Sequence, residues 1–251
     1  MIVQKKKSLR IAEYWADEPA EPVDADLIRW FQQPEARAGM FCREFFTILI
    51  ELTRDEEQVF AAIEKDTRYE IRRAQTKDDL TCELINPDAD TLRIFCDYYD
   101  QFAKQKAQAP LDRAWLKLLL DVEAMRLSRS HHAGGETLVW HSYHWMNRRA
   151  TLLNSASSLR GTDDAARRQM IGRANRLLHW QDILSFKAAG AEAYDFGGWY
   201  EGKTNEPRLK INHFKEEFGG EIVKSYICER AVTWKGTLFL TARRLILGNA
   251  I

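Results

Sequence analysis

The chain has 251 residues, of which 45% are hydrophobic and 29% are charged. This length can bury a full core as one large domain or two small ones, so stability does not require a metal or disulfides. Lysine and arginine balance aspartate and glutamate at 37 each, which excludes a large, indiscriminate nucleic-acid surface but leaves room for local basic patches. The longest apolar run, FFTILI, is far too short to span a bilayer, and no apolar segment typical of a secretory signal follows the N-terminal lysines.

The first part of the chain predicts irregular structure, then a strand and a helix. Prolines punctuate residues 1–35, which favours irregular structure with one short helix around 25–33. Residues 45–52 are apolar and β-branched, as expected for a strand. Residues 53–77 predict a helix, because Thr53 can cap it and acidic residues fill its first turn.

The middle of the chain predicts two helices followed by a strand meander. After a strand at 80–85, apolar residues at helical spacing predict helices over 91–106 and 113–125. Three strand patterns separated by turn residues follow, at 125–130, 136–146 and 150–158. Consecutive strands of this kind indicate an antiparallel sheet.

The last part alternates helix and strand. A 3.6-residue period predicts a helix over 175–189, ended by Gly190. The elements expected after it are a strand at 191–198, a helix at 206–218 and strands at 221–228 and 237–247. The tail also concentrates cations, namely Lys224, Arg230, Lys235, Arg243 and Arg244. Such a patch could hold phosphates or be an ordinary solvated face.

The four cysteines are widely scattered along the chain. They are Cys42, Cys82, Cys96 and Cys228, with no closely spaced pair among them. This spacing argues against a zinc site and against a disulfide framework. We therefore expect a reduced, cytoplasmic protein that binds no metal.

A glycine stands directly before the helix expected at 175–189, in the segment QMIGRA (residues 169–174). Backbone N–H groups of a glycine-containing loop, together with those of the first helical turn, can bind a phosphate. Gly172 lacks a Cβ that would hold the phosphate away, and Arg173 or Arg176 could add charge. The alternative is a loop glycine among solvated arginines.

The order of two helices, meander, glycine loop, helix and strand resembles the GNAT superfamily of N-acetyltransferases. In that superfamily the donor pyrophosphate lies on a loop of the form [Q/R]-x-x-G-x-[G/A]. The resemblance implies an α/β (α+β) fold, with a central mixed, mostly antiparallel sheet flanked by helices. It also implies a CoA thioester as donor, no metal, and a pantetheine arm received between splayed strands. The donor-binding residues that it implies are Asn154, Ser155, Arg167, Gln169, Gly172, Arg173, Ala174 and Arg176.

Three further segments, 68–77, 174–203 and 213–226, resemble signatures of the Fem-type aminoacyltransferases that build peptidoglycan cross-bridges. That family has two acetyltransferase-like halves, the first of them degenerate. The resemblance implies a reduced N-terminal half over residues 1–80 and an acyltransferase domain over residues 81–251. The chain is similar to shorter relatives found in surface-glycan pathways, some of which acylate nucleotide-linked amino sugars with acyl-CoA.

Acyl transfer to an amine requires an unprotonated nucleophile, a polarised carbonyl and a protonated leaving group. His141 and His144 lie on opposite faces of the strand at 136–146, and either could accept the proton or be structural. Asp195 could orient the amine or cap a turn. Lys215 matches the Fem-type pattern, in which this lysine is associated with substrate phosphate or transition-state charge.

Other residues are candidates for binding the acceptor. Trp199, Tyr200 and Lys203 could wall the acceptor pocket, and Arg68 and Arg72 could bind its phosphates or form a solvated helix end. We expect an N-acyltransferase that moves an acyl group from acyl-CoA to the amine of a cell-envelope precursor, such as a nucleotide-linked amino sugar. Two alternatives are an aminoacyl-tRNA-dependent transferase acting on a peptidoglycan precursor and a non-catalytic binding module. A homodimer is compatible with each.

Overall fold

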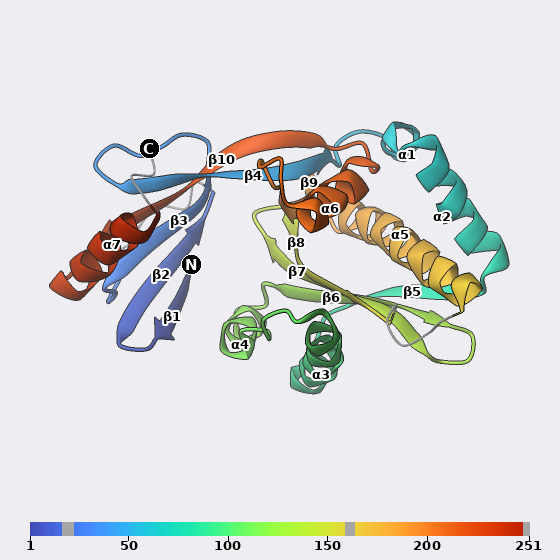
Figure 1. Cartoon of the computed structure of the whole chain (residues 1–251), viewed down its shortest axis with the longest axis horizontal. Coiled ribbons are helices and arrows are strands. Elements are labelled where there is room, and N and C mark those ends of the chain that lie inside the picture. The colour runs from blue at the N-terminus through green and yellow to red at the C-terminus, as the bar shows by residue number, and fades with distance from the viewer. Residues whose placement is uncertain (17–22, 159–163, 248–251) are drawn as a thin grey trace. The chain divides into compact units, whose positions relative to one another are not determined.

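The computed structural model describes residues 1–16, 23–158 and 164–247. Within them the chain forms two compact units (Figure 1). The second unit comprises Ile48–Gly197 and Lys203–Glu221, and the remaining described residues form the first. The division falls within β4 (Phe41–Glu51) and at the start of β10 (Glu221–Ala231). A division into residues 1–80 and 81–251, expected from the family resemblance, stays a prediction.

The first unit is a mixed sheet with one helix. Besides β4 and β10 it contains β1 (Ile2–Lys6), β2 (Leu9–Trp15), β3 (Leu27–Gln33) and α7 (Trp234–Leu247). The strand order is β1-β2-β3-β10-β4. β1 is antiparallel to β2, β2 is parallel to β3, and β3 is antiparallel to β10. Leu240 of α7 is buried in a core with Ile11, Leu27 and Phe41.

Two sequence predictions for this unit are wrong. The described part of residues 1–35 forms β1, β2 and β3 rather than irregular structure with a helix at 25–33. Residues 237–247 lie in α7 rather than in a strand. Gly236, Leu240 and Arg243 recur on one helix face, where a Cβ at Gly236 would lie 2.0 Å from the Asp26 carbonyl oxygen. The apolar and β-branched residues outside this face made the segment resemble a strand.

The expectation of no disulfide is also wrong. Cys42 on β4 and Cys228 on β10 form a disulfide, with Cα atoms 4.1 Å apart. The two cysteines are 186 positions apart in the sequence, but their strands are neighbours in the sheet. Spacing along a chain does not report which strands pair. Cys82 and Cys96 are free thiols.

The second unit is built on an antiparallel meander that continues into one parallel strand, in the order β9-β8-β7-β6-β5. Its strands are β5 (Leu80–Ile85), β6 (Met125–His132), β7 (Thr137–Met146), β8 (Arg149–Ser157) and β9 (Ala193–Gly198). Its helices are α1 (Glu56–Ala62), α2 (Lys65–Lys77), α3 (Ala89–Lys106), α4 (Arg113–Asp121), α5 (Ala165–Ala188) and α6 (Glu206–Glu216). These elements confirm the expected meander, the two helices before it and the helix at 206–218.

The sheet of the second unit is covered on both faces (Figure 1). α5 lies across one face of β5 to β8, with α2 packed beside it, and α3 and α4 lie on the other face. Under α5, Leu138 and Val139 of β7 pack against Ile171, Ala174 and Leu178. Burying these aliphatic side chains on a regular spacing fixes the rotation of α5 over the sheet.

Two helix boundaries differ from the sequence prediction. α5 begins at Ala165 rather than at residue 175, and the Asp164 side chain caps it by accepting from the Ala166 N–H at 2.8 Å. The helix expected over 53–77 is two helices, and the first is capped by Asp55 with Gln58 in a capping box rather than by Thr53. Tertiary packing of the segment before residue 175 against α2 and the sheet extends α5 toward its N-terminus.

Candidate functional site

A buried carboxylate organises the space between α5 and the sheet. One oxygen of Asp182, Oδ2, accepts a hydrogen bond from Ser128 Oγ at 2.8 Å and from Tyr143 OH at 2.6 Å. His141 Nδ1 lies 2.9 Å from the same oxygen. All four side chains are buried. A carboxylate can occupy such a place because several donors replace its lost hydration.

His141 is held at both ring nitrogens. Its Nε2 lies 2.9 Å from Asn175 Oδ1 on α5, opposite the contact with Asp182. This ring is therefore enclosed by the helix that covers it, and it has no free nitrogen to face a substrate. These contacts fit the structural role considered for His141, and its role as proton acceptor stays a prediction.

A second chain of hydrogen bonds leads from Tyr143 to the beginning of β9 and back to α5. Tyr143 OH lies 2.8 Å from Tyr194 OH, which lies 2.7 Å from His179 Nδ1. Burial raises the pKa of both tyrosines well above their usual value and lowers the pKa of His179 well below its usual value. These groups therefore stay neutral at neutral pH. His179 also packs against a ring of phenylalanines, which are Phe196, Phe214 and Phe218.

Asp195 lies where β8 and β9 separate. Its Oδ2 accepts from Arg149 Nη2 at 2.6 Å and Nε at 3.0 Å, and its Oδ1 accepts from the Gly197 N–H at 2.8 Å. Gly197 has φ of 71°, and a Cβ there would lie 2.8 Å from the Leu152 carbonyl oxygen. Only glycine fits this backbone without strain. Asp195 is therefore an ion-paired carboxylate in β9, two residues before a backbone position that requires glycine.

The two strands pair over a short stretch only. The parallel register runs from Arg149 opposite Ala193 to Thr151 opposite Asp195 and then stops. β8 continues to Ser157 and β9 to Gly198. The two strands therefore diverge after Thr151, and the rest of β8 is not paired with β9. Asn154 and Ser155 lie on this part of β8, and Asn154 donates to Ser142 Oγ at 3.0 Å.

Lys215 on α6 is buried close to this point. Burial lowers its pKa to about 8, partly offset by the negative charge of Asp195. Its positive charge in turn contributes to the low pKa of His179, after burial and the neighbouring His141. At neutral pH a buried lysine with a lowered pKa donates a stronger hydrogen bond than a solvated lysine and gives up its proton more readily. The structure thus groups Lys215, Asp195 and His179.

His144 lies apart from this group. His141 and Tyr143 both point to Asp182, so side-chain alternation turns His144 to the opposite face of β7. It is buried, and burial lowers its pKa to about 4. His144 is therefore neutral at pH 7 but a weak base, and the structure does not bring it to Asp195.

The predicted phosphate loop is a helix, so the structural basis of that prediction is wrong. Residues 169–174 lie inside α5, where backbone N–H groups are used by the helix itself. Arg173 is buried and donates from Nη2 to Asp78 Oδ1 at 3.0 Å. The other two arginines also have acidic partners, since Arg176 binds Glu217 and Arg167 binds Glu136. These contacts tie α5 to its surroundings. Donor binding by Gln169, Gly172 and Ala174 stays a prediction.

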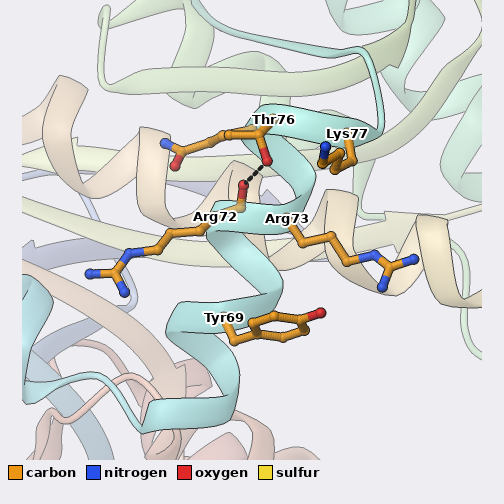
Figure 2. Close-up of a pocket in the computed structure, with 6 residues that line it drawn as sticks. Tyr69, Arg72, Arg73, Thr76 and Lys77 are labelled. Atoms are coloured by element: carbon orange, nitrogen blue, oxygen red, sulfur yellow. Dashed lines mark hydrogen bonds between the residues drawn. The ribbon is translucent and has the colours of Figure 1, made fainter.

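Arg72 lies on the outer face of α2, beside an open hollow of about 570 Å³ (Figure 2). Tyr69, Arg73, Thr76 and Lys77 also line this hollow, and Figure 2 shows Arg73 directed to the opposite side of α2 from Arg72. Arg68 lies one turn before Arg72 on the same helix, and its guanidinium donates to the Ala61 carbonyl at 2.6 Å near the end of α1. The guanidinium of Arg72 lies over the neighbouring Phe60 ring. Both arginines therefore contact the end of α1, and acceptor binding by them stays a prediction.

The three candidates for an acceptor wall are close in the sequence, and their role stays a prediction. Trp199 and Tyr200 belong to the first unit, where the Trp199 N–H donates to the Phe46 carbonyl at 2.7 Å and the two rings lie 6.3 Å apart. Lys203 belongs to the second unit and is exposed.

Sequence reasoning missed Asn175, His179 and Asp182, although a signal was present. These three polar positions recur on one face of α5. The buried Leu178 and Ile183 lie on or next to this face. Polar groups on a buried face need partners on the sheet. Ser128 on β6 and Tyr143 on β7 are such partners. The missing information was which strands α5 covers.

The described residues contain no group of three His, Cys, Asp or Glu side chains arranged to hold a metal. Among the helices of the described segments, none is long and apolar enough to cross a membrane.

The arrangement of strands and helices defines a mixed α/β fold of the GNAT and Fem type, and solved structures share it. FemX superimposes with a TM-score of 0.61 at 11% identity, over 78% of this chain and 63% of that one. The C-terminal domain of a lysylphosphatidylglycerol synthetase from Agrobacterium fabrum gives 0.59 at 13% identity, over 97% and 84%. L-PGS from Bacillus licheniformis gives 0.52 at 11% identity, over 87% and 73%.

This chain spans less than two thirds of the FemX chain that it matches. No family model and no curated protein matches the sequence. At these identities the similarity establishes the fold, and the chemistry has to be argued from the site.

Proposed function

We propose that this protein is an N-acyltransferase that moves an acyl group from a CoA thioester to the amine of a cell-envelope precursor, such as a nucleotide-linked amino sugar. The splay between β8 and β9 carries this proposal, because it leaves one edge of β8 unpaired by β9 beside Asp195 and Lys215. An extended donor arm can bind such an edge through backbone hydrogen bonds. The expected pantetheine contacts, Asn154 and Ser155, lie on the part of β8 that is not paired with β9.

The reaction needs little covalent chemistry from the protein. The amine nitrogen attacks the carbonyl carbon, a C–N bond forms and the C–S bond breaks. The amine loses one proton and the leaving thiolate gains one. In this proposal Lys215 stabilises the charge that develops or takes part in the proton transfer, since its pKa of about 8 suits both roles near neutral pH. Asp195 and Arg149 orient the amine and Lys215.

A second candidate is transfer from an aminoacyl-tRNA. It is favoured by the helical conformation of residues 169–174 and by the acidic partners of Arg167, Arg173 and Arg176, which leave no preformed pyrophosphate loop there. The name of lysylphosphatidylglycerol synthetase also describes transfer of an amino acid to a phospholipid. Both candidates share the site at Asp195 and Lys215 and differ in the donor carrier.

Donor binding separates the candidates. We expect acetyl-CoA or a longer acyl-CoA to raise the melting temperature of the purified protein, with a nonhydrolysable thioether analogue giving the same shift. Acylation of amino-sugar nucleotides by mass spectrometry then identifies the acceptor. No shift with any CoA ester, together with transfer from aminoacyl-tRNA, would replace the first candidate by the second. Binding of a donor without turnover of any amine would instead support a non-catalytic binding module.

For the first candidate we also propose a cytoplasmic location. Disulfides are rare in that compartment, so Cys42 and Cys228 would be present there as thiols. Their oxidation state in freshly isolated protein therefore tests the location as well.

A further inference from the structure

The outer face of α7 carries an exposed apolar stripe. Trp234, Leu238 and Leu245 lie at positions i, i+4 and i+11, which one face of an α-helix brings into line. These side chains are 70%, 62% and 83% exposed. Ile246, beside Leu245, is 81% exposed. Side chains of this size normally leave the solvent when a partner is available.

The fold does not require this stripe. The opposite face of α7 already anchors the helix, with Leu240 buried in the core of the first unit and Arg243 bound to Glu229 at 2.8 Å. Gly236 packs close to the Asp26 backbone on the same side. α7 therefore packs on the first unit through one face and exposes apolar side chains on the opposite face, which is typical of a surface that binds a partner.

The charges on α7 have one sign. The helix sequence WKGTLFLTARRLIL contains three basic residues and no acidic one. Lys235 and Arg244 are exposed and fall on either side of the stripe, since they follow Trp234 and precede Leu245. Lys5, Lys6 and Lys7 are also exposed, in and beside the β1–β2 turn of the same unit.

We propose that α7 is an interfacial anchor that lies in the surface of an anionic lipid bilayer. The apolar stripe would enter the boundary between headgroups and acyl chains, with Trp234 at the level that tryptophan prefers. Lys235 and Arg244 would meet anionic headgroups. With 14 residues the helix cannot span a bilayer, so it lies along the surface.

Charge also selects this occupant over a second copy of the chain. Two α7 helices packed through their stripes would bring Lys235 and Arg244 of each copy together, with no acidic residue of either helix to pair with them. An anionic bilayer supplies the opposite charge. The inference goes beyond the proposed transferase function and does not depend on it, because membrane binding needs no donor or acceptor.

Vesicle cosedimentation tests the proposal with the whole chain. We expect binding to vesicles of phosphatidylcholine and phosphatidylglycerol in equal parts, weaker binding at high salt, and little binding to phosphatidylcholine alone. The double variant Leu238→Glu/Leu245→Glu should lower the partition coefficient by about tenfold or more. Lys235→Glu should weaken binding to the anionic vesicles only. Brominated lipids should quench the fluorescence of the wild type more than that of Trp234→Phe.

Ile94→Glu is the matched control, because Ile94 is an exposed apolar residue of α3 in the other unit. It should bind vesicles as the wild type does. Circular dichroism and melting temperature establish that each variant folds. Equal binding by the wild type and Leu238→Glu/Leu245→Glu would overturn the proposal. A concentration-dependent dimer that the same double variant abolishes would overturn it in favour of a second copy.

Discussion

His141 on β7 and His179 on α5 stack against each other, with ring centroids 4.1 Å apart and planes inclined by 29°. Both rings are buried. His141 binds Asp182, and His179 binds Tyr194, which reaches Asp182 through Tyr143. The two histidines thus close a circle of contacts that joins α5, β7 and β9. This circle supports the point at which β8 and β9 separate.

Removing the acceptor at the centre of the circle should destabilise the protein. Asp182→Asn replaces the charged oxygen that Ser128, Tyr143 and His141 contact by a neutral amide, which accepts hydrogen bonds more weakly, so we expect the free energy of unfolding to fall by about 2–4 kcal/mol. Urea denaturation measures this loss. Asp121→Asn is the control, because its exposed ion pair with Lys117 should contribute about 0.5 kcal/mol or less. Equal losses in the two variants would contradict the structural role of Asp182.

The buried His144 should make stability depend on pH. Its pKa is about 4 in the native protein and 6.5 ordinarily, so below pH 6.5 the unfolded chain binds a proton that the native state does not. The contribution is complete above pH 6.5 and is lost as the pH falls toward 4, by up to about 3 kcal/mol. His144→Gln should therefore flatten the dependence of unfolding free energy on pH over this range. His213→Gln, at an exposed position of α6, should leave the slope unchanged.

Lys215 should matter for transfer rather than for stability. We expect Lys215→Met to lower kcat by about a hundredfold or more and to remove an inflection near pH 8 from the rate profile. Its melting temperature should be equal to or above that of the wild type, because burial removes much of the hydration of an ammonium group and so costs free energy. The control Lys210→Met changes an exposed lysine of the same helix. A wild-type rate in Lys215→Met would exclude Lys215 from the chemistry.

Arg173 should act through the packing of α5 on α2 and not through the donor. Its buried pair with Asp78 predicts that Arg173→Met lowers the free energy of unfolding by about 3 kcal/mol, because Asp78 is left unpaired. The double variant Arg173→Met/Asp78→Leu should recover part of this loss. Affinity for a CoA ester, measured by calorimetry well below the melting temperature, should not change. Weaker donor binding without loss of stability would restore the phosphate role suggested by the sequence.

Counting free thiols tests the disulfide between Cys42 and Cys228. Denatured protein that was never reduced should show the two thiols of Cys82 and Cys96, and two more should appear after reduction. A Cys42→Ser/Cys228→Ser variant should unfold about 2–4 kcal/mol more easily than the oxidised wild type, because the bridge closes a long loop. Cys96→Ser leaves the bridge intact and serves as the control. Four thiols before reduction would show that the pair is reduced in solution.

Local patterns were enough for much of the second unit. Strand-favouring residues bounded by turns predicted β6, β7 and β8, and apolar residues at helical spacing predicted α3 and α4. The same reasoning failed for α7, where an outward apolar stripe concealed the spacing of Gly236, Leu240 and Arg243. It also failed at β1 to β3, of which β3 pairs with the distant β10.

Of the candidate site, the sequence by itself determined the residue types. It singled out Asp195 before a double glycine and Lys215 in its motif, and it indicated a strand meander followed by a long helix. Only the tertiary structure decided which of these residues meet. It placed the glycine-containing segment inside α5 and paired Arg173 with Asp78. It also enclosed His141 in a network with Asp182 and His179. The physical reason is that buried polar groups need partners from other elements, and only the packed fold brings those partners together.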